Sequence, residues 1–131
     1  MLEAFGKLKN VKKAIYIKMF RSKGSDFYIY RNTPNTIEFI IENDGVRYDL
    51  TNASISFVVK RNENLLDAGM LFDKTEASGI TLTNAVDGIM QVSIDAADTS
   101  TLSNEITHKY YWKLIVDNQV AGIGVFNIIP N

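Results

Sequence analysis

Few side chains in this sequence are of the types that perform catalysis or bind metal ions. His108 is the single histidine, and there is no cysteine. A hydrolase would have to use His108 as its base, yet no Gly-x-Ser-x-Gly turn supplies a nucleophile. Zinc sites and calcium loops need Cys/His clusters or an Asp-x-Asp-x-Asp-Gly run, and neither pattern occurs. We therefore expect no metal ion and no cofactor, with His108 at the surface or capping a strand.

Two pairs of carboxylates have spacings that can be compared with those of catalytic carboxylate pairs and of helix caps. Glu38 and Glu42 are four residues apart, which on a strand is about 13 Å, beyond the separation used by glycosidases. Asp95 and Asp98 are three residues apart, the spacing of a helix N-cap and the carboxylate that follows it. The sequence therefore indicates a protein that is not an enzyme and has no small-molecule substrate.

Binding chemistry is better represented than catalysis. Tyr28 and Tyr30 lie in the predicted strand Asp26–Tyr30 and are expected to be exposed aromatic residues, whose rings could stack on a sugar. Tyr48 and Tyr111 are further stacking candidates. A glycan-binding site at Tyr28 and Tyr30 is therefore an alternative function.

The N-terminal segment carries a different kind of binding chemistry. Residues 1–23 hold seven basic groups and one acid, a net charge of about +6, against about −7 for the remainder. Apolar residues recur every third position among the lysines, which predicts a basic amphipathic helix of about three turns. We expect an arm that docks on a neighbouring protein through Leu2, Phe5, Lys7, Leu8, Lys9, Val11, Lys12 and Lys13.

Two other interpretations of the basic segment remain open. It could be a solvated, flexible tail, as blocks of like charge often are. Nucleic acid is the less favoured partner, because only Phe5 and Tyr16 could stack on bases and the rest of the chain is acidic.

The elements that would position these residues are predicted to be strands. Thr36–Asn43 and Ala53–Lys60 each alternate apolar and polar residues, as strands with one buried side do. Asp44-Gly45 lies after the first of them and favours a tight turn. We expect a hairpin here, and the rest of the chain to be organised around it.

Alternation and turn residues predict the remaining elements. They are strands at Ala14–Phe20, Asp26–Tyr30, Ile80–Thr83, Ile89–Ile94, Lys109–Val116 and Val120–Ile129, one helical turn from Asp95 to Leu102, and a strand with a glycine bulge, favoured over a helical turn, at Leu65–Asp73. Short strands with turns every 8–12 residues predict an all-β fold, an antiparallel β-sandwich of about 7–9 strands. The predicted division is a basic arm at residues 1–23 and a sandwich domain at 24–131.

Length and composition agree with this division. The chain has 131 residues, of which 46% are hydrophobic and 22% charged, values typical of one globular domain. No apolar run approaches the roughly 20 residues of a membrane span. We expect a soluble protein, made in the cytoplasm, without a membrane partner.

Three segments in order, TIEFIIENDGVRYDLTNASISFVVKR, GITLTNAVDGIMQVSIDAADTSTL and HKYYWKLIVDNQVAGIGVFNI, carry a family likeness. The first segment matches a strand that leads through a turn into a second strand, by its Asp44-Gly45 and Asp49-Leu50-Thr51. The second matches a capped helical turn with a buried leucine, by its Ile94-Asp95 and Leu102. The third matches a Tyr-rich strand, by its Tyr110-Tyr111-Trp112. The order resembles the immunoglobulin-like β-sandwich domains of tailed-phage virion proteins, and in particular the N-terminal domain of the baseplate upper protein family.

The resemblance covers about residues 30–129 and implies a function. It implies an immunoglobulin-like sandwich in a non-enzymatic structural or adaptor protein of the tail, baseplate or fibre attachment, packed in a symmetric assembly. The expected partners are other virion proteins and copies of itself, with no nucleic acid. The expected location is the virion, after synthesis in the host cytoplasm.

Overall fold

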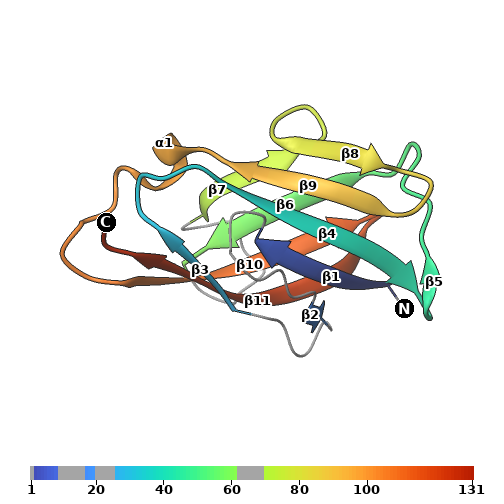
Figure 1. Ribbon diagram of the computed structural model, residues 1–131, viewed down its shortest axis with the longest axis horizontal. Helices are drawn as coiled ribbons and strands as arrows, with labels where there is room; N and C mark the ends of the chain where they lie inside the picture. The colour runs from blue at the N-terminus through green and yellow to red at the C-terminus, as the bar shows by residue number, and fades with distance from the viewer. Residues whose placement is uncertain (1, 9–16, 20–25, 62–69) are drawn as a thin grey trace.

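The computed structural model describes residues 2–8, 17–19, 26–61 and 70–131, which form two β-sheets packed face to face (Figure 1). Sheet I, in front in Figure 1, has the order β2 (Ile17–Met19), β1 (Leu2–Leu8), β4 (Asn35–Asn43), β9 (Ile89–Ile94) and β8 (Ile80–Asn84), with β5 (Val46–Arg47) paired to β4. Sheet II has the order β3 (Phe27–Tyr30), β11 (Gln119–Ile129), β10 (His108–Val116), β6 (Ile55–Lys60) and β7 (Met70–Thr75).

The predicted all-β sandwich is confirmed. The described residues hold eleven strands rather than 7–9, because β1, predicted as a helix, and the short strand β5 add to the predicted set, and one helix, α1 (Ala96–Thr99). The orders β1-β4-β9-β8 and β7-β6-β10-β11 correspond to the two sheets of an immunoglobulin fold. β3 pairs parallel with β11, and every other strand pair is antiparallel. No helix in the described ranges is long and apolar enough to cross a membrane.

The predicted hairpin between Thr36–Asn43 and Ala53–Lys60 is wrong, although both strands exist. Asp44 and Gly45 have φ of 51° and 83° and turn the chain, but into the two-residue β5. The chain then crosses to sheet II, where β6 pairs with β10 and β7. Because each strand has one apolar face, the two bury these faces against each other across the core, with ring centroids of Phe39 and Phe57 5.9 Å apart.

An aromatic cluster around Trp112 fills the space between the sheets. Its ring centroid lies 5.4 Å from Phe27, 5.8 Å from Phe39 and 5.9 Å from Phe57. Gly122 faces this ring so closely that a Cβ there would lie 2.9 Å from Trp112 Cη2. The Trp112 indole is therefore what requires a glycine at position 122.

Leu2–Leu8 is a strand, so the predicted helix is wrong over these residues. β1 pairs with β4 over its whole length, with Ala4 opposite Ile41. Leu2 and Ala4 are buried in the core, whereas Phe5 on the opposite face is half-buried. Two of the inward positions are Ala4 and Gly6, and such small residues hide a period-2 pattern behind an apparent three-residue spacing. The rest of the predicted helix lies outside the described residues.

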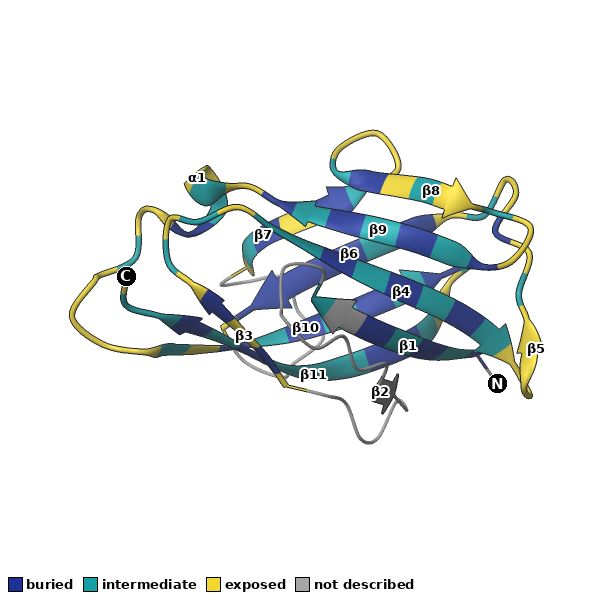
Figure 2. Ribbon diagram, viewed as in Figure 1, coloured by how far each residue is buried: buried dark blue, intermediate teal, exposed yellow. Residues whose placement is uncertain are grey.

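The other predicted elements agree with the structure where it describes them. Burial alternates along β4, β9 and β10 (Figure 2). Within Ala14–Phe20 only Ile17–Met19 is described, as β2, and within Leu65–Asp73 only Met70–Asp73 is described, as the start of β7. The helix ends at Thr99, earlier than predicted, and Leu102 is half-buried rather than buried. Asp117 and Asn118 form the turn between β10 and β11, with φ of 49° and 64°.

Candidate functional site

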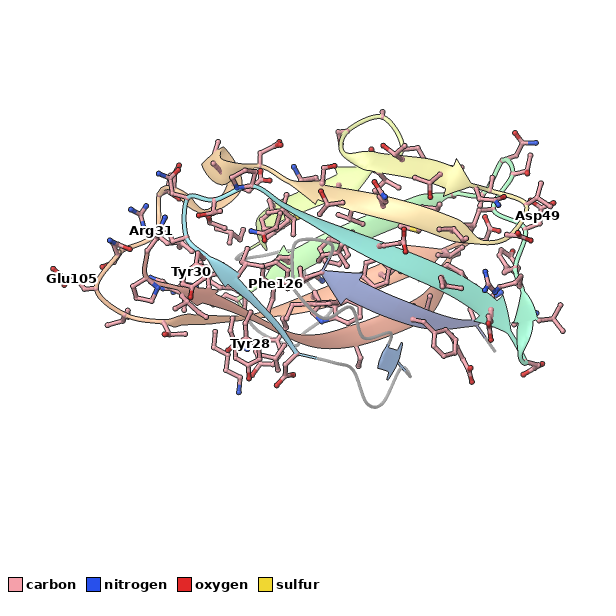
Figure 3. All side chains as sticks on the ribbon, viewed as in Figure 1. Tyr28, Tyr30, Arg31, Asp49, Glu105 and Phe126 are labelled. Atoms are coloured by element: carbon pink, nitrogen blue, oxygen red, sulfur yellow. The ribbon has the colours of Figure 1, made fainter. Side chains whose placement is uncertain are left out.

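Strand β3 presents two tyrosines to solvent at the edge of sheet II. Tyr28 and Tyr30 are 58% and 56% exposed, while Phe27 and Ile29 between them are buried and anchor the strand (Figure 3). The predicted strand and the predicted exposure of its two tyrosines are therefore confirmed. The two rings are held outward on a strand whose other face is fixed in the core.

Sheet II places further side chains beside these tyrosines. Tyr28 is opposite Asn127 on β11, and Asn127 is opposite Lys109 on β10, so the three form one row across the sheet. The Asn127 amide donates to the Phe27 carbonyl at 3.4 Å. Lys109 Nζ lies 5.5 Å from the ring centroid of Tyr111, a cation–π distance. We call Tyr28, Tyr30, Lys109, Tyr111 and Asn127 the tyrosine surface.

The β3 edge lacks the features that protect the edge strands β7 and β8 against pairing with another chain. On β7, the buried Lys74 puts a charge on the core side of the edge, and the β6/β7 register shifts at Lys60. The β8/β9 pair shifts register between Thr81 and Asn84. Bulges and inward charges of this kind hinder edge pairing. β3 pairs with β11 without a register shift, and none of the residues Phe27–Tyr30 is charged.

The structure separates the residues of the predicted docking arm. Leu2 is buried, and Leu8 is half-buried and packs on the core, so neither is free to meet a neighbour while β1 stays in sheet I. Phe5 lies on the outer face of sheet I, opposite Ile40. The side chain of Lys7 is not among those described, and Lys9, Val11, Lys12 and Lys13 lie outside the described residues. Docking through these lysines and Val11 stays a prediction.

The side chains considered for catalysis have structural partners. His108 Nε2 lies 2.8 Å from the Ser103 carbonyl oxygen, to which the ring donates. Glu42 is half-buried and pairs with Arg47 at 3.4 Å. Within the described ranges, no three His, Asp or Glu side chains gather closely enough to hold a metal ion.

Asp95 and Asp98 form the predicted cap and also bind a lysine that the sequence did not suggest. The Asp95 N–H donates to Asp98 Oδ2 at 2.7 Å. Lys74 Nζ lies 2.8 Å from Asp98 and 3.4 Å from Asp95. Burial lowers the pKa of Lys74, but its hydrogen bond to Asp98 and the charges of both carboxylates outweigh this and raise the pKa overall. Lys74 thus holds α1 against the end of sheet II.

Tyr48, a stacking candidate from sequence, is occupied elsewhere. Its hydroxyl donates to Asp117 Oδ2 at 2.5 Å, and Asp117 Oδ1 accepts from the Ser54 N–H at 2.9 Å. The Tyr48 hydrogen bond is the main cause that lowers the pKa of Asp117, and the same bond raises the pKa of Tyr48. Tyr48 therefore fastens the β10–β11 turn and is not part of the tyrosine surface.

Sequence reasoning found Tyr28 and Tyr30 but missed their neighbours. Asn127 and Lys109 reach Tyr28 only through the parallel pairing of β3 with β11, which joins residues about a hundred positions apart. No local pattern encodes such a pairing.

No protein-family model matches the sequence, and no curated protein is significantly similar to it.

Proposed function

We propose that this protein is a non-enzymatic structural adaptor of a tailed-phage virion, which assembles through the β3 edge of sheet II. The observation that carries the proposal is the pair of exposed tyrosines on an edge strand without charges or bulges. Tyrosine is enriched at protein interfaces, and open strand edges pair with strands of other chains. The virion setting rests on the resemblance of three sequence segments to phage virion sandwich domains.

The partners we propose are other virion proteins and copies of this chain. A strand added next to β3 would gain main-chain hydrogen bonds, while Tyr28 and Tyr30 would cover side chains of the incoming strand. The basic residues Lys9, Lys12 and Lys13 follow β1 in sequence and would supply contacts to acidic neighbours. The symmetric use of one edge by two copies would give a closed dimer.

We predict that Tyr28→Lys combined with Tyr30→Lys abolishes this association. Charges on an edge strand oppose pairing, and the double variant also removes both aromatic anchors. By sedimentation velocity of the full chain, wild type should form a concentration-dependent oligomer, and the double variant should dissociate at least about tenfold more readily.

The matched control is Val46→Lys combined with Val86→Lys, which adds the same charge at two side chains that are 69% and 68% exposed outside sheet II. This control should sediment as wild type does. A monomeric wild type, or equal association of the two double variants, would contradict assembly through β3.

A second candidate function is glycan binding, because Tyr28 lies in one row with an amide and an ammonium group. Such a row offers a ring face to a sugar and polar groups to its hydroxyls. This candidate would use the same surface for a host-surface ligand in place of a virion partner.

A further inference from the structure

The main-chain groups at the free edge of β3 belong to its two tyrosines. On the other edge, the Arg31 N–H donates to the Ile129 carbonyl of β11 at 2.8 Å, and the Phe27 carbonyl accepts from a side chain of β11 at 3.4 Å. The N–H and C=O groups of successive residues point alternately to the two edges of a strand. Those of Tyr28 and Tyr30 therefore point away from β11, where no described strand pairs with β3.

The side chains of the same two residues are the exposed part of β3. Tyr28 and Tyr30 are more than half exposed, whereas Phe27 and Ile29 are already covered by the core. The strand carries no charge, and the whole chain has a net charge of −1, so two copies repel each other little. A strand that pairs with this edge thus meets two unpaired peptide groups and two rings.

A second copy of β3 supplies the complement of this edge. Two identical strands related by a two-fold axis perpendicular to the sheet run antiparallel, and they exchange hydrogen bonds only between residues whose peptide groups face each other. Tyr28 and Tyr30 are those residues in both copies. With the axis at Ile29, Tyr28 of one copy lies opposite Tyr30 of the other, and each of the two pairs exchanges both of its N–H···O=C bonds.

The neighbouring registers are less favourable. With the axis at Tyr28, each Tyr30 faces Asp26, so a carboxylate replaces a ring as its partner. With the axis at Tyr30, each Tyr28 faces Asn32, whose φ of 56° is outside the range of a strand. The axis at Ile29 instead gives two aromatic cross-strand pairs, which stabilise antiparallel sheets.

We infer that two copies of this chain join by antiparallel pairing of β3 about an axis at Ile29, with Tyr28 opposite Tyr30 of the second copy. This inference rests on the proposed function and names the partner and the register of its interface. Sheet II then continues from one copy into the other. Its outer face carries one row from Asn127 through Tyr28 to Tyr30 and Ile129 of the second copy.

Amide hydrogen exchange of the wild-type full chain, resolved by residue, tests the pairing. As the protein concentration rises, the N–H groups of Tyr28 and Tyr30 should become protected at least about tenfold, because pairing removes them from water. The Ile29 N–H, which already faces β11, should change less. A lack of concentration-dependent protection at both tyrosines would overturn the inference and the proposed function together.

Single cysteines test the register, since the chain has no cysteine of its own. Opposite Cα atoms of a hydrogen-bonded pair are about 5.5 Å apart, within disulfide range, whereas two copies of position 28 are more than about 7 Å apart in this register. Under mild oxidation, a mixture of Tyr28→Cys and Tyr30→Cys should give at least about fivefold more crosslinked dimer than either variant alone. A mixture of Val46→Cys and Val86→Cys, which are exposed outside sheet II, is the matched control and should give no such excess.

A wild-type sample mixed from isotope-labelled and unlabelled copies tests the same register without substitution. Its filtered NMR spectrum should show the Ile29 Hα in contact with the Ile29 Hα of the other copy, as in a pair without hydrogen bonds. Contact of Ile29 with Phe27 or Arg31 of the other copy, or equal crosslinking of the mixture and of one variant alone, would overturn the register. Protected tyrosine amides would then leave assembly through β3 standing.

Discussion

Replacing Trp112 by alanine is expected to lower the free energy of unfolding by about 3–5 kcal/mol, the usual cost of removing a large aromatic side chain from a core. The Trp112 ring is buried and is surrounded by rings from both sheets, namely Phe27, Phe39 and Phe57. Its loss leaves a cavity that these strands cannot close without breaking their pairing. Because such a domain is stable by only about 5–15 kcal/mol, much of the stability would be lost.

Urea denaturation followed by circular dichroism measures the effect of Trp112→Ala. The matched control is Tyr111→Ala, the next residue on β10, whose side chain is on the outer face and only half-buried. We expect a loss below about 1.5 kcal/mol for the control, mostly from its contact with Lys109. Similar losses for both variants would mean that the core is not centred on Trp112.

The second large effect is expected for Ala4→Asp. Ala4 is 0% exposed, in the inward row of β1, and a side chain added at Gly122 would place its Cβ 3.5 Å from that of Ala4. A carboxylate there would be buried without a partner, which costs about 3–5 kcal/mol. The added atoms would also press on the Trp112 region. The sandwich is therefore expected to unfold largely or fully.

Thermal unfolding of the Ala4→Asp variant, with Glu3→Gln as control, tests whether β1 is a strand of sheet I or part of an arm outside the core. Glu3 is the neighbouring residue on the outer face of β1, so its change should cost less than about 1 kcal/mol. A docking arm outside the core would tolerate both substitutions equally. Equal melting temperatures for Ala4→Asp and Glu3→Gln would contradict the placement of β1 in sheet I.

The strands of this fold could be predicted from the sequence because their burial follows the alternation of their residues. The inward sets of β4 and β9 are large aliphatic or aromatic side chains, and all are buried. The pairing of β6 could not be predicted, because alternation shows that a strand has one buried face but not which sheet it joins. Nearness in sequence favoured a hairpin, whereas burying two apolar faces against each other placed β4 and β6 in different sheets.

β1 escaped prediction for a different reason. Its inward positions include Ala4 and Gly6, and Ala4 is small where Gly122 of β11 meets the strand. The size of Ala4 follows from a partner over a hundred residues away, so the local pattern of Leu2, Phe5 and Leu8 gave the wrong period. The tyrosine surface could be predicted only in part. The exposure of Tyr28 follows from the alternation of burial along β3, but its proximity to Lys109 follows from the pairing of β3 with β11.

Site-specific photo-crosslinking tests assembly through β3 most directly. A photoreactive phenylalanine analogue replaces Tyr28 in one variant of the full chain and Val46 in a second variant. Each variant is made during phage growth, and the analogue is activated by light in purified particles. We predict that position 28 forms one discrete crosslinked product, identified by mass spectrometry as a second copy or another virion protein, and that position 46 forms much less. Absence of the protein from particles, or efficient crosslinking at position 46 with none at position 28, would contradict the account.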